Sequence, residues 1–345
     1  MTPRERVLNV LRGESTDRIP FVIWNNKLPG GDVERDLMAQ ELCVFVKTTA
    51  YQIHHEGVTV ERQNYEEADG SPRVRVVYHT PAGDLTEVQH HMPGTVWTEK
   101  HIFEKPEDYD AVEALLQSCR YVPCYDKFAQ DDKAYGDQSI GRPGTLHAPF
   151  HYVMNHIMGM TTFWDQWFEN EERVRRVIEL LSANSIAQVR VLAESPIHYA
   201  VVDGNTQASI IGPDRYREFH MTFIEEASSI LHKAGKLVAA HMDGDNALLA
   251  PLIGETPLDV IESFSPPPEC DLGLTDALQA WPGKAIICNY PPSRHLCDEV
   301  EVRRIAEALL KEGADSGRFM MGVMEDIPTY EHVVMLAKMT REWRS

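Results

Sequence analysis

The sequence lacks the features that mark membrane, secreted and nucleotide-binding proteins. No run of about 18 apolar residues occurs in the chain, so we expect no membrane span. Residues 1–14 carry charges where a signal peptide needs an apolar segment, which favours a cytoplasmic protein. No strand-like segment is followed by Gly-x-Gly-x-x-Gly or a Walker loop, which disfavours an open nucleotide-binding sheet.

Cations and paired cysteines are also scarce. Lys and Arg number 33 against 53 Asp and Glu, a net charge of −20, which disfavours binding to the phosphates of a nucleic acid. The six cysteines form no Cys-x-x-Cys pair. Scattered thiols in a chain of 345 residues indicate a reducing compartment rather than a disulfide framework.

The segments that are present predict a (β/α)₈ TIM barrel. Thr2, Pro3 and Glu5 have the spacing of a capping box at the start of a helix, and the apolar run 21–24 follows as a first strand. From about residue 170 onward, helical periodicity alternates with short apolar runs, which indicates parallel strands buried on both faces. These later strands are expected at 200–203, 237–241, 259–262, 285–289 and 319–323.

We expect one TIM-barrel domain over residues 1–345, because no linker, repeat or low-complexity segment divides the chain. Residues 58–98 differ from the barrel pattern. Two extended segments, 74–78 and 85–88, are bounded by turn signals at 69–72 and 81–84, which predicts inserted antiparallel hairpins.

Polar side chains fall at the end of each late strand, where a barrel forms its active site. His241 and Asp243 are two residues apart, so in extended chain they face the same side and can hold one ion. With Glu262 and Glu325 from later strand ends, they form a candidate site for Zn²⁺ or another divalent ion. The alternative is a hydrogen-bonded His–carboxylate pair without metal, which could also transfer protons.

Further candidates surround this group. Asp203 is a third candidate catalytic residue, or a helix cap. Cys288 could replace Glu325 as a metal ligand, or be a buried inert cysteine. Candidate substrate-binding residues lie at the first strand end, after Pro149 and at the strand that ends near residue 289; packing explains several of them equally well: Trp24, Asn25, His151, Tyr152, Asn155 and Asn289.

Several motifs together resemble the uroporphyrinogen decarboxylase superfamily. The resemblance extends over nearly the whole chain and implies a TIM barrel. It rests on four stretches: Arg4–Leu8 with Leu11–Glu14 and Asp17–Pro20, Thr80–Gly83, Gly212–Gly244 with its His241-Met242-Asp243-Gly244 end, and Glu262–Pro268 with Asp271-Leu272.

The resemblance implies one of two activities. Members that decarboxylate uroporphyrinogen carry an arginine-rich N-terminal segment, whereas residues 21–30 here hold one cation, Lys27, and no arginine. Another branch consists of zinc-dependent methyltransferases that work with a corrinoid protein. Those that act on thiols have His-x-Cys, and Asp243 stands here in the position of that cysteine.

We therefore expect a metal-dependent O-demethylating methyltransferase. It would take a methyl group from a small methoxylated, for example aromatic, substrate and pass it to a corrinoid carried by a partner protein, with neither nucleic acid nor membrane as a partner. Zinc held by imidazole and carboxylates would be the electrophile. A decarboxylase of a small carboxylated substrate is the alternative, and a non-catalytic binding protein that keeps the barrel is a third possibility.

Overall fold

The computed structural model describes residues 1–92, 95–327 and 329–343. Its contacts divide the chain into two compact units, one formed by residues 1–50, 124–146 and 192–345, the other by 51–123 and 147–191. The sequence pattern predicted a single domain with an insertion over 58–98. The second unit includes that segment and a further one, 147–191, for which the sequence suggested no separate packing.

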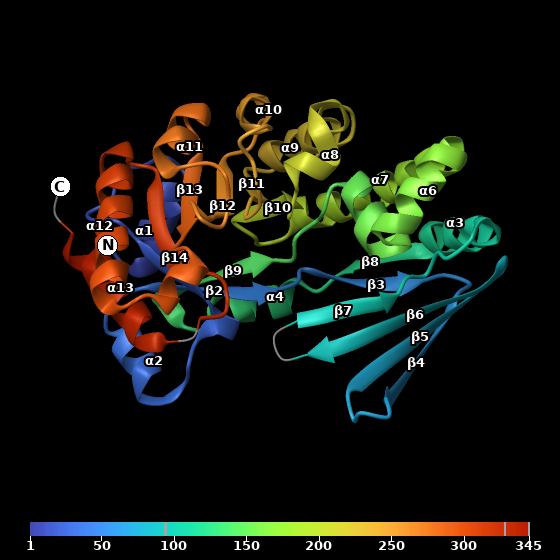
Figure 1. The fold of residues 1–345 in the computed structure, drawn as a ribbon, viewed down its shortest axis with the longest axis horizontal. Helices are drawn as coiled ribbons and strands as arrows, with labels where there is room; N and C mark the ends of the chain where they lie inside the picture. Colours follow the sequence, from blue (N-terminus) through green and yellow to red (C-terminus); the bar gives the residue numbers. More distant parts are fainter. Residues whose placement is uncertain (93–94, 328, 344–345) are drawn as a thin grey trace. The chain divides into compact units, whose positions relative to one another are not determined.

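The first unit is a barrel of parallel strands, which confirms the predicted TIM-barrel fold (Figure 1). The strands are joined in the order β10-β11-β12-β13-β14-β1-β2-β9, and a bridge between Thr145 and Val201 joins the two ends of this order. Their bounds are β1 Phe21–Trp24, β2 Cys43–Thr48, β9 Ser139–Pro143, β10 Tyr199–Gly204, β11 Leu237–His241, β12 Val260–Phe264, β13 Ala285–Asn289 and β14 Phe319–Val323.

Alternate side chains of these strands fill the barrel interior. Val22 and Trp24 of β1, Cys43 and Phe45 of β2, and Ala239 of β11 belong to one buried cluster. Side chains alternate between the two faces of a strand. A residue two positions after an interior residue therefore also points inward, but one layer closer to the mouth of the barrel. This periodicity brings the strand-end residue His241 above the core.

Helices cover the outside of the sheet (Figure 1). The first helix begins with the predicted capping box, in which Thr2 and Glu5 bond each other's backbone NH groups. The helices of this unit are α1 Pro3–Leu11, α2 Gly31–Met38, α4 Tyr125–Asp132, α8 Ala208–Arg215, the π-helical turn η5 Tyr216–Met221, α9 Thr222–Lys233, α10 Ala250–Glu255, α11 Leu274–Ala280, α12 Glu299–Gly313 and α13 Tyr330–Glu342.

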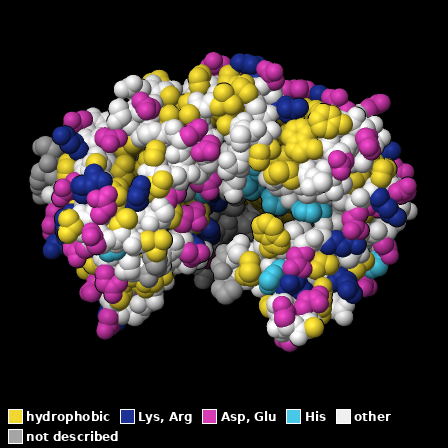
Figure 2. Space-filling view, viewed as in Figure 1, with side chains coloured by type: hydrophobic (Ala, Val, Ile, Leu, Met, Phe, Trp, Pro, Cys, Tyr) yellow, Lys and Arg dark blue, Asp and Glu magenta, His cyan; other side chains and the backbone are white. Residues whose placement is uncertain are grey.

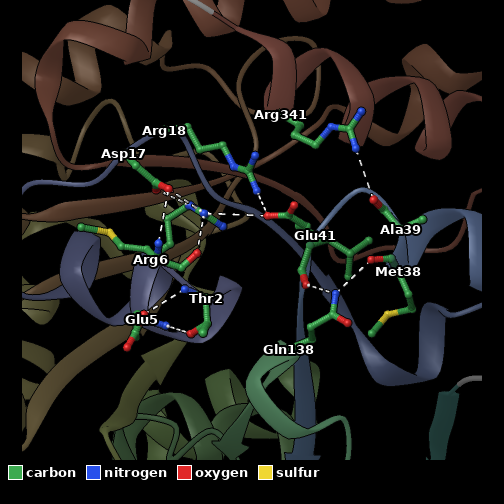
Figure 3. A network of polar contacts seen from close by, with 12 residues as sticks. Thr2, Glu5, Arg6, Asp17, Arg18, Met38, Ala39, Glu41, Gln138 and Arg341 are labelled. Carbon is green, nitrogen blue, oxygen red and sulfur yellow. Dashed lines mark hydrogen bonds and ion pairs between the residues drawn. The ribbon is translucent and has the colours of Figure 1, made fainter.

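A polar network connects the segments that enter the barrel strands at their amino ends (Figure 3). Arg6 of α1 is buried and donates from its guanidinium to both oxygens of Asp17, which lies before β1. Arg18 pairs with Glu41, just before β2. Gln138, just before β9, donates to the backbone oxygens of α2 and of the following turn. The network therefore braces the end of the barrel opposite to the candidate site.

The second unit contains the expected antiparallel strands, extended beyond the predicted range. Strands β4 Thr59–Glu66, β5 Pro72–Thr80, β6 Gly83–Met92 and β7 Thr95–Lys100 form one sheet in chain order. Positions 93–94 of the predicted insertion lie outside the described residues. A second small sheet pairs β3 Tyr51–His55 with β8 Cys119–Pro123, and the helices are α3 Tyr109–Ser118, α5 Pro149–Tyr152, the π-helical turn η4 Val153–Met158, α6 Met160–Glu169 and most of α7 Glu171–Glu194.

The surface reflects the acidic composition. Acidic and basic side chains are interspersed over the face drawn in Figure 2, with carboxylates over both units. Among the helices of the described residues, none has the length and apolar character that crossing a bilayer requires.

A buried ion pair between α1 and α4 provides a test of the barrel's stability. Arg4 Nη2 donates to Asp132 Oδ2 at 2.5 Å, and Asp132 Oδ1 accepts from the backbone NH of Gly141 in β9. Burial alone would raise the pKa of Asp132, but hydrogen bonds from His198 and Arg4 outweigh burial and lower it to about 2.

We expect Asp132→Asn to lower the free energy of unfolding by about 3 kcal/mol near neutral pH, because Arg4 loses its buried partner. A carboxylate with a depressed folded-state pKa stabilises fully above about pH 4, and this contribution is lost as the pH falls through 2. Denaturant titrations between pH 7 and pH 2 should therefore show the difference shrinking in acid. A constant difference over this range would contradict the assignment.

Candidate active site and metal centre

His241, the last residue of β11, is held at both ring nitrogens. Its Nδ1 donates to Glu262 Oε2 at 3.0 Å, and its Nε2 lies 3.3 Å from Asp243 Oδ2. The side chain is 6% exposed. A Cβ at Gly204, the last residue of β10, would lie 3.0 Å from His241 Cβ, so this close approach depends on glycine at the neighbouring strand end.

Glu262 is a buried carboxylate at the centre of a hydrogen-bond network across three other strands. Arg142 of β9 donates to it twice, from Nε to Oε1 at 3.1 Å and from Nη2 to Oε2 at 2.5 Å. The Tyr199 hydroxyl of β10 donates to Oε1 at 3.1 Å. With His241, both oxygens of Glu262 are engaged by protein donors.

Charge pairing determines the protonation of this network. Burial alone would raise the pKa of Glu262, but Arg142 and His241 hold it well below its usual range, so the group stays a carboxylate. Burial alone would lower the pKa of His241, but hydrogen bonds with Asp243 and Glu262 outweigh burial and raise it to about 9. The metal-free imidazole is therefore protonated at neutral pH, which suits a proton carrier, and a metal ion at Nε2 would replace that proton.

His241, Asp243 and Glu325 form a group with metal-binding geometry. One ligand atom from each of the three lies within 4.8 Å of the others, and no second such group occurs among the residues that the structure describes. Burial and the charge of Asp243 raise the pKa of Glu325. A cation between these groups would relieve that repulsion. One nitrogen and two carboxylates are a donor set that suits Zn²⁺ with a position left for substrate.

The arrangement differs from the expected ligand set in the role of Glu262. The sequence suggested Glu262 as a fourth ligand, but its oxygens contact Arg142, Tyr199 and His241 Nδ1. A carboxylate on the far nitrogen of a metal-binding histidine fixes the ring and raises its basicity. Glu262 is therefore placed to orient His241.

Cys288, the alternative ligand, lies on the other face of the sheet. It follows Ile287 of the interior cluster in β13, so its side chain faces the helices. Burial raises the pKa of its thiol well above the usual range, which disfavours the thiolate that metal binding requires. Packing between the sheet and the helices therefore accounts for Cys288 without a bound metal.

An irregularity in β10 turns the Asp203 side chain away from the barrel interior. The pairing with β11 shifts between Val201 and Asp203, so that Asp203 lies opposite Ala240 instead of an interior residue. Its carboxylate is buried and accepts from His220 Nδ1 at 3.0 Å and from Thr206. The predicted catalytic role has no support from these contacts, which join β10 to η5.

Of the two first-strand candidates, Trp24 lies beside His241 and Asn25 contacts Lys47. The indole of Trp24 stacks on the His241 ring, with 5.7 Å between centroids and 24° between planes. Asn25 Oδ1 accepts from the backbone NH of Lys47 at 3.0 Å. Asn289 is buried and bonded to Ser265 and to the backbone NH of Met324, so it holds the loop that leads to Glu325.

His151, Tyr152 and Asn155 lie in the second unit. Asn155 Nδ2 and His151 Nε2 are 2.7 Å apart, and the His151 ring stacks on His147. Tyr152 packs against His156, whose pKa is lowered to about 4 by burial and by His147. These contacts are internal to the unit, and the predicted substrate-binding roles stay predictions.

Arg142, Tyr199 and Lys47 belong to the site and were not expected. Arg142 stands in the short segment Ser139–Pro143, too brief and too polar to show as a strand, and Tyr199 is at the beginning of its strand. Lys47 follows the apolar run 43–46 directly. The rule that selected His241, a polar residue after an apolar run, would have found Lys47 as well.

Comparison with known proteins agrees with this fold. The chain belongs to the uroporphyrinogen decarboxylase (URO-D) family, whose model matches residues 97–344. The sequence has no significant match among curated proteins.

Two solved structures are similar to the chain to different extents. A methyltransferase from Methanosarcina mazei has 12% sequence identity and a TM-score of 0.58, over 99% of this chain and 98% of that one, a likeness of fold. A dipeptide epimerase from Enterococcus faecalis V583 has 11% identity and a TM-score of 0.25, over 79% of this chain and 92% of that one, which supports no argument.

The role of Glu262 can be tested by titrating His241 in metal-free protein. We expect Glu262→Gln to lower the pKa of His241 from about 9 to below about 8, because an amide cannot stabilise the imidazolium as a carboxylate does. NMR titration of the ring resonances measures this value. The pair His79–Asp84 of the second unit provides the internal control, because Asp84 raises the pKa of His79 and this shift should not change in the variant.

The same variant has a signature in stability. The folded-state pKa of His241 lies above the unfolded-state value of about 6.5, so its stabilisation is full below that pH and is lost as the pH rises through 9. Glu262→Gln should weaken this dependence. A His241 pKa that stays near 9 in the variant would show that Glu262 does not control the ring.

Proposed function

We propose that the chain is a metal-dependent methyltransferase that demethylates a small methoxylated compound and passes the methyl group to a corrinoid on a partner protein. The observation that carries the proposal is the His241, Asp243 and Glu325 group at the carboxyl ends of the barrel strands. The fold likeness to a methyltransferase adds support. The corrinoid partner rests on the sequence motifs shared with corrinoid-dependent members of the superfamily.

Each residue of the group has a separate task. His241, Asp243 and Glu325 would hold the metal ion, and Glu262 with Arg142 would keep the imidazole in place. When bound, Zn²⁺ supplies Lewis acidity toward an ether oxygen. Trp24 forms an apolar wall beside His241, which positions substrate and excludes water.

The reaction transfers a methyl group without its bonding electrons. The carbon–oxygen bond breaks, its electron pair stays on the oxygen, and the methyl group goes to the reduced cobalt of the corrinoid, which supplies the electron pair for the new bond. The product is an alcohol or phenol after it takes a proton. Positioning is the main contribution of the chain's own residues.

We expect purified protein to contain about one zinc per chain. His241→Ala should lose both the zinc and the demethylation of methoxylated substrates in the presence of a reduced corrinoid protein. Elemental analysis and methylcobalamin absorbance measure the two quantities. Full demethylation by a metal-free His241→Ala protein would refute the proposed role of the metal.

Two adjacent carboxylates provide a matched pair of variants. Glu325→Gln should weaken zinc binding at least as much as loss of an orienting residue, about 10–100-fold, because it removes a direct ligand. Asp326→Asn removes the neighbouring, exposed carboxylate that pairs with Lys27 and should leave zinc affinity unchanged. Equal effects of the two variants on zinc affinity would argue against a specific ligand set.

Decarboxylation is the second candidate, favoured by membership of the URO-D family. A porphyrinogen with many carboxylates requires several free cations. The one cation of residues 21–30, Lys27, already pairs with Asp326 at 2.6 Å. Release of labelled CO₂ from small carboxylated substrates would identify this activity, with His241 as the proton carrier.

A further inference from the structure

Lys47 places an ammonium group at the mouth of the barrel, beside the candidate metal centre. Cys43 and Phe45 face the barrel interior, and Lys47 continues the same alternation at the end of β2. Its Nζ lies 3.5 Å from the centroid of the Trp24 indole. The His241 ring, at 5.7 Å, and the Arg142 guanidinium, at 5.6 Å, are further neighbours of that indole. The distance from Lys47 Nζ to the centre of the His241 ring is therefore at most the sum of the Lys47–Trp24 and Trp24–His241 distances.

The ammonium is the cation of this region that has no carboxylate partner. Arg142 is paired with Glu262, and Lys27 with Asp326. For Lys47 Nζ, the described part of the chain provides no hydrogen-bond acceptor or ion pair, and the indole face is its one neighbour of note. The Lys47 side chain is exposed to solvent. An anion arriving from solvent can therefore pair with it without breaking an existing salt bridge.

A second donor is tied to the same place. Asn25 uses its side-chain oxygen to accept the backbone NH of Lys47. Its amide nitrogen is not bonded within the residues that the structure describes, so it is available to a ligand. An ammonium and an amide NH₂ are complementary to the oxygens of a carboxylate.

The charge state of the amine agrees with such a role. Burial, with the neighbouring charges of Arg142 and Lys27, lowers the pKa of Lys47 to about 8, so most molecules carry the ammonium at pH 7.

We propose that Lys47 and Asn25 form a subsite for a carboxylate on the substrate, so that the methoxylated compound is an acid. This inference rests on the proposed function, and it adds the substrate's second functional group. Lys47 and His241 both lie close to the indole of Trp24, which limits the substrate to a small one, such as a single aromatic ring that bears the methoxy group at one end and the carboxylate at the other. Lys47 is a specificity-determining residue in this account.

The experiment compares two ligands of nearly the same size and shape, one with a negative charge and one neutral. Dissociation constants of para-methoxybenzoate and para-methoxybenzamide are measured by calorimetry at pH 7 on the protein as purified. We expect the acid to bind about 10–100-fold more tightly than the amide, the range for a hydrogen bond to a charged group. In Lys47→Met the preference should fall to nearly none, and in Lys47→Arg it should persist.

Lys311→Met on the exposed face of α12 is the matched control, because it removes one positive charge far from the strand ends. It should keep the preference for the acid. Melting temperature and zinc content of every variant check that the fold and the metal group are intact. Equal binding of acid and amide to the unmodified chain, no binding of either, or a preference that survives in Lys47→Met would overturn the subsite.

This design can refute the carboxylate subsite and the proposed demethylation independently of each other. A preference for the acid without methyl transfer to any corrinoid protein would refute the proposed reaction and leave the subsite standing. Demethylation without a preference for the acid would refute the subsite and leave the reaction standing.

Discussion

The site depends on one buried charge, the carboxylate of Glu262. A carboxylate removed from water is costly unless donors surround it, and here Arg142, Tyr199 and His241 supply them. Each donor comes from a different strand, so satisfying the charge fixes β9, β10 and β11 relative to β12. The orientation of His241, and with it the position of any ion bound there, follows from that requirement.

The large elements of the fold were predictable because their signals are repetitive. Short apolar runs that alternate with helical periodicity from β10 onward indicated parallel strands, and the structure has a strand at each of these positions. The same logic selected His241, Asp243 and Glu325, since polar residues that follow buried strands gather at one end of a barrel. Local pattern and global topology agree in this half of the chain.

The features that were not predictable arise from pairing between distant segments. The shift between Val201 and Asp203 is a property of how β10 meets β11, and no local pattern announces it. It moves Asp203 to the helix side, although its position after an apolar run is the same as that of His241. Likewise, Arg142 and Glu262 are 120 residues apart, so their pairing depends on the closed barrel. The separate packing of 147–191 is a further long-range property.

The network of Arg6, Asp17, Arg18 and Glu41 at the amino end of the barrel has an evolutionary consequence (Figure 3). Contacts that hold the early strands together are separated from the loops that carry the chemistry by the length of the strands themselves. Loops at the opposite end can accumulate substitutions while folding is preserved. A single ancestral barrel can in this way give rise to relatives with unlike reactions, which is the pattern expected of a family whose members share architecture more than sequence.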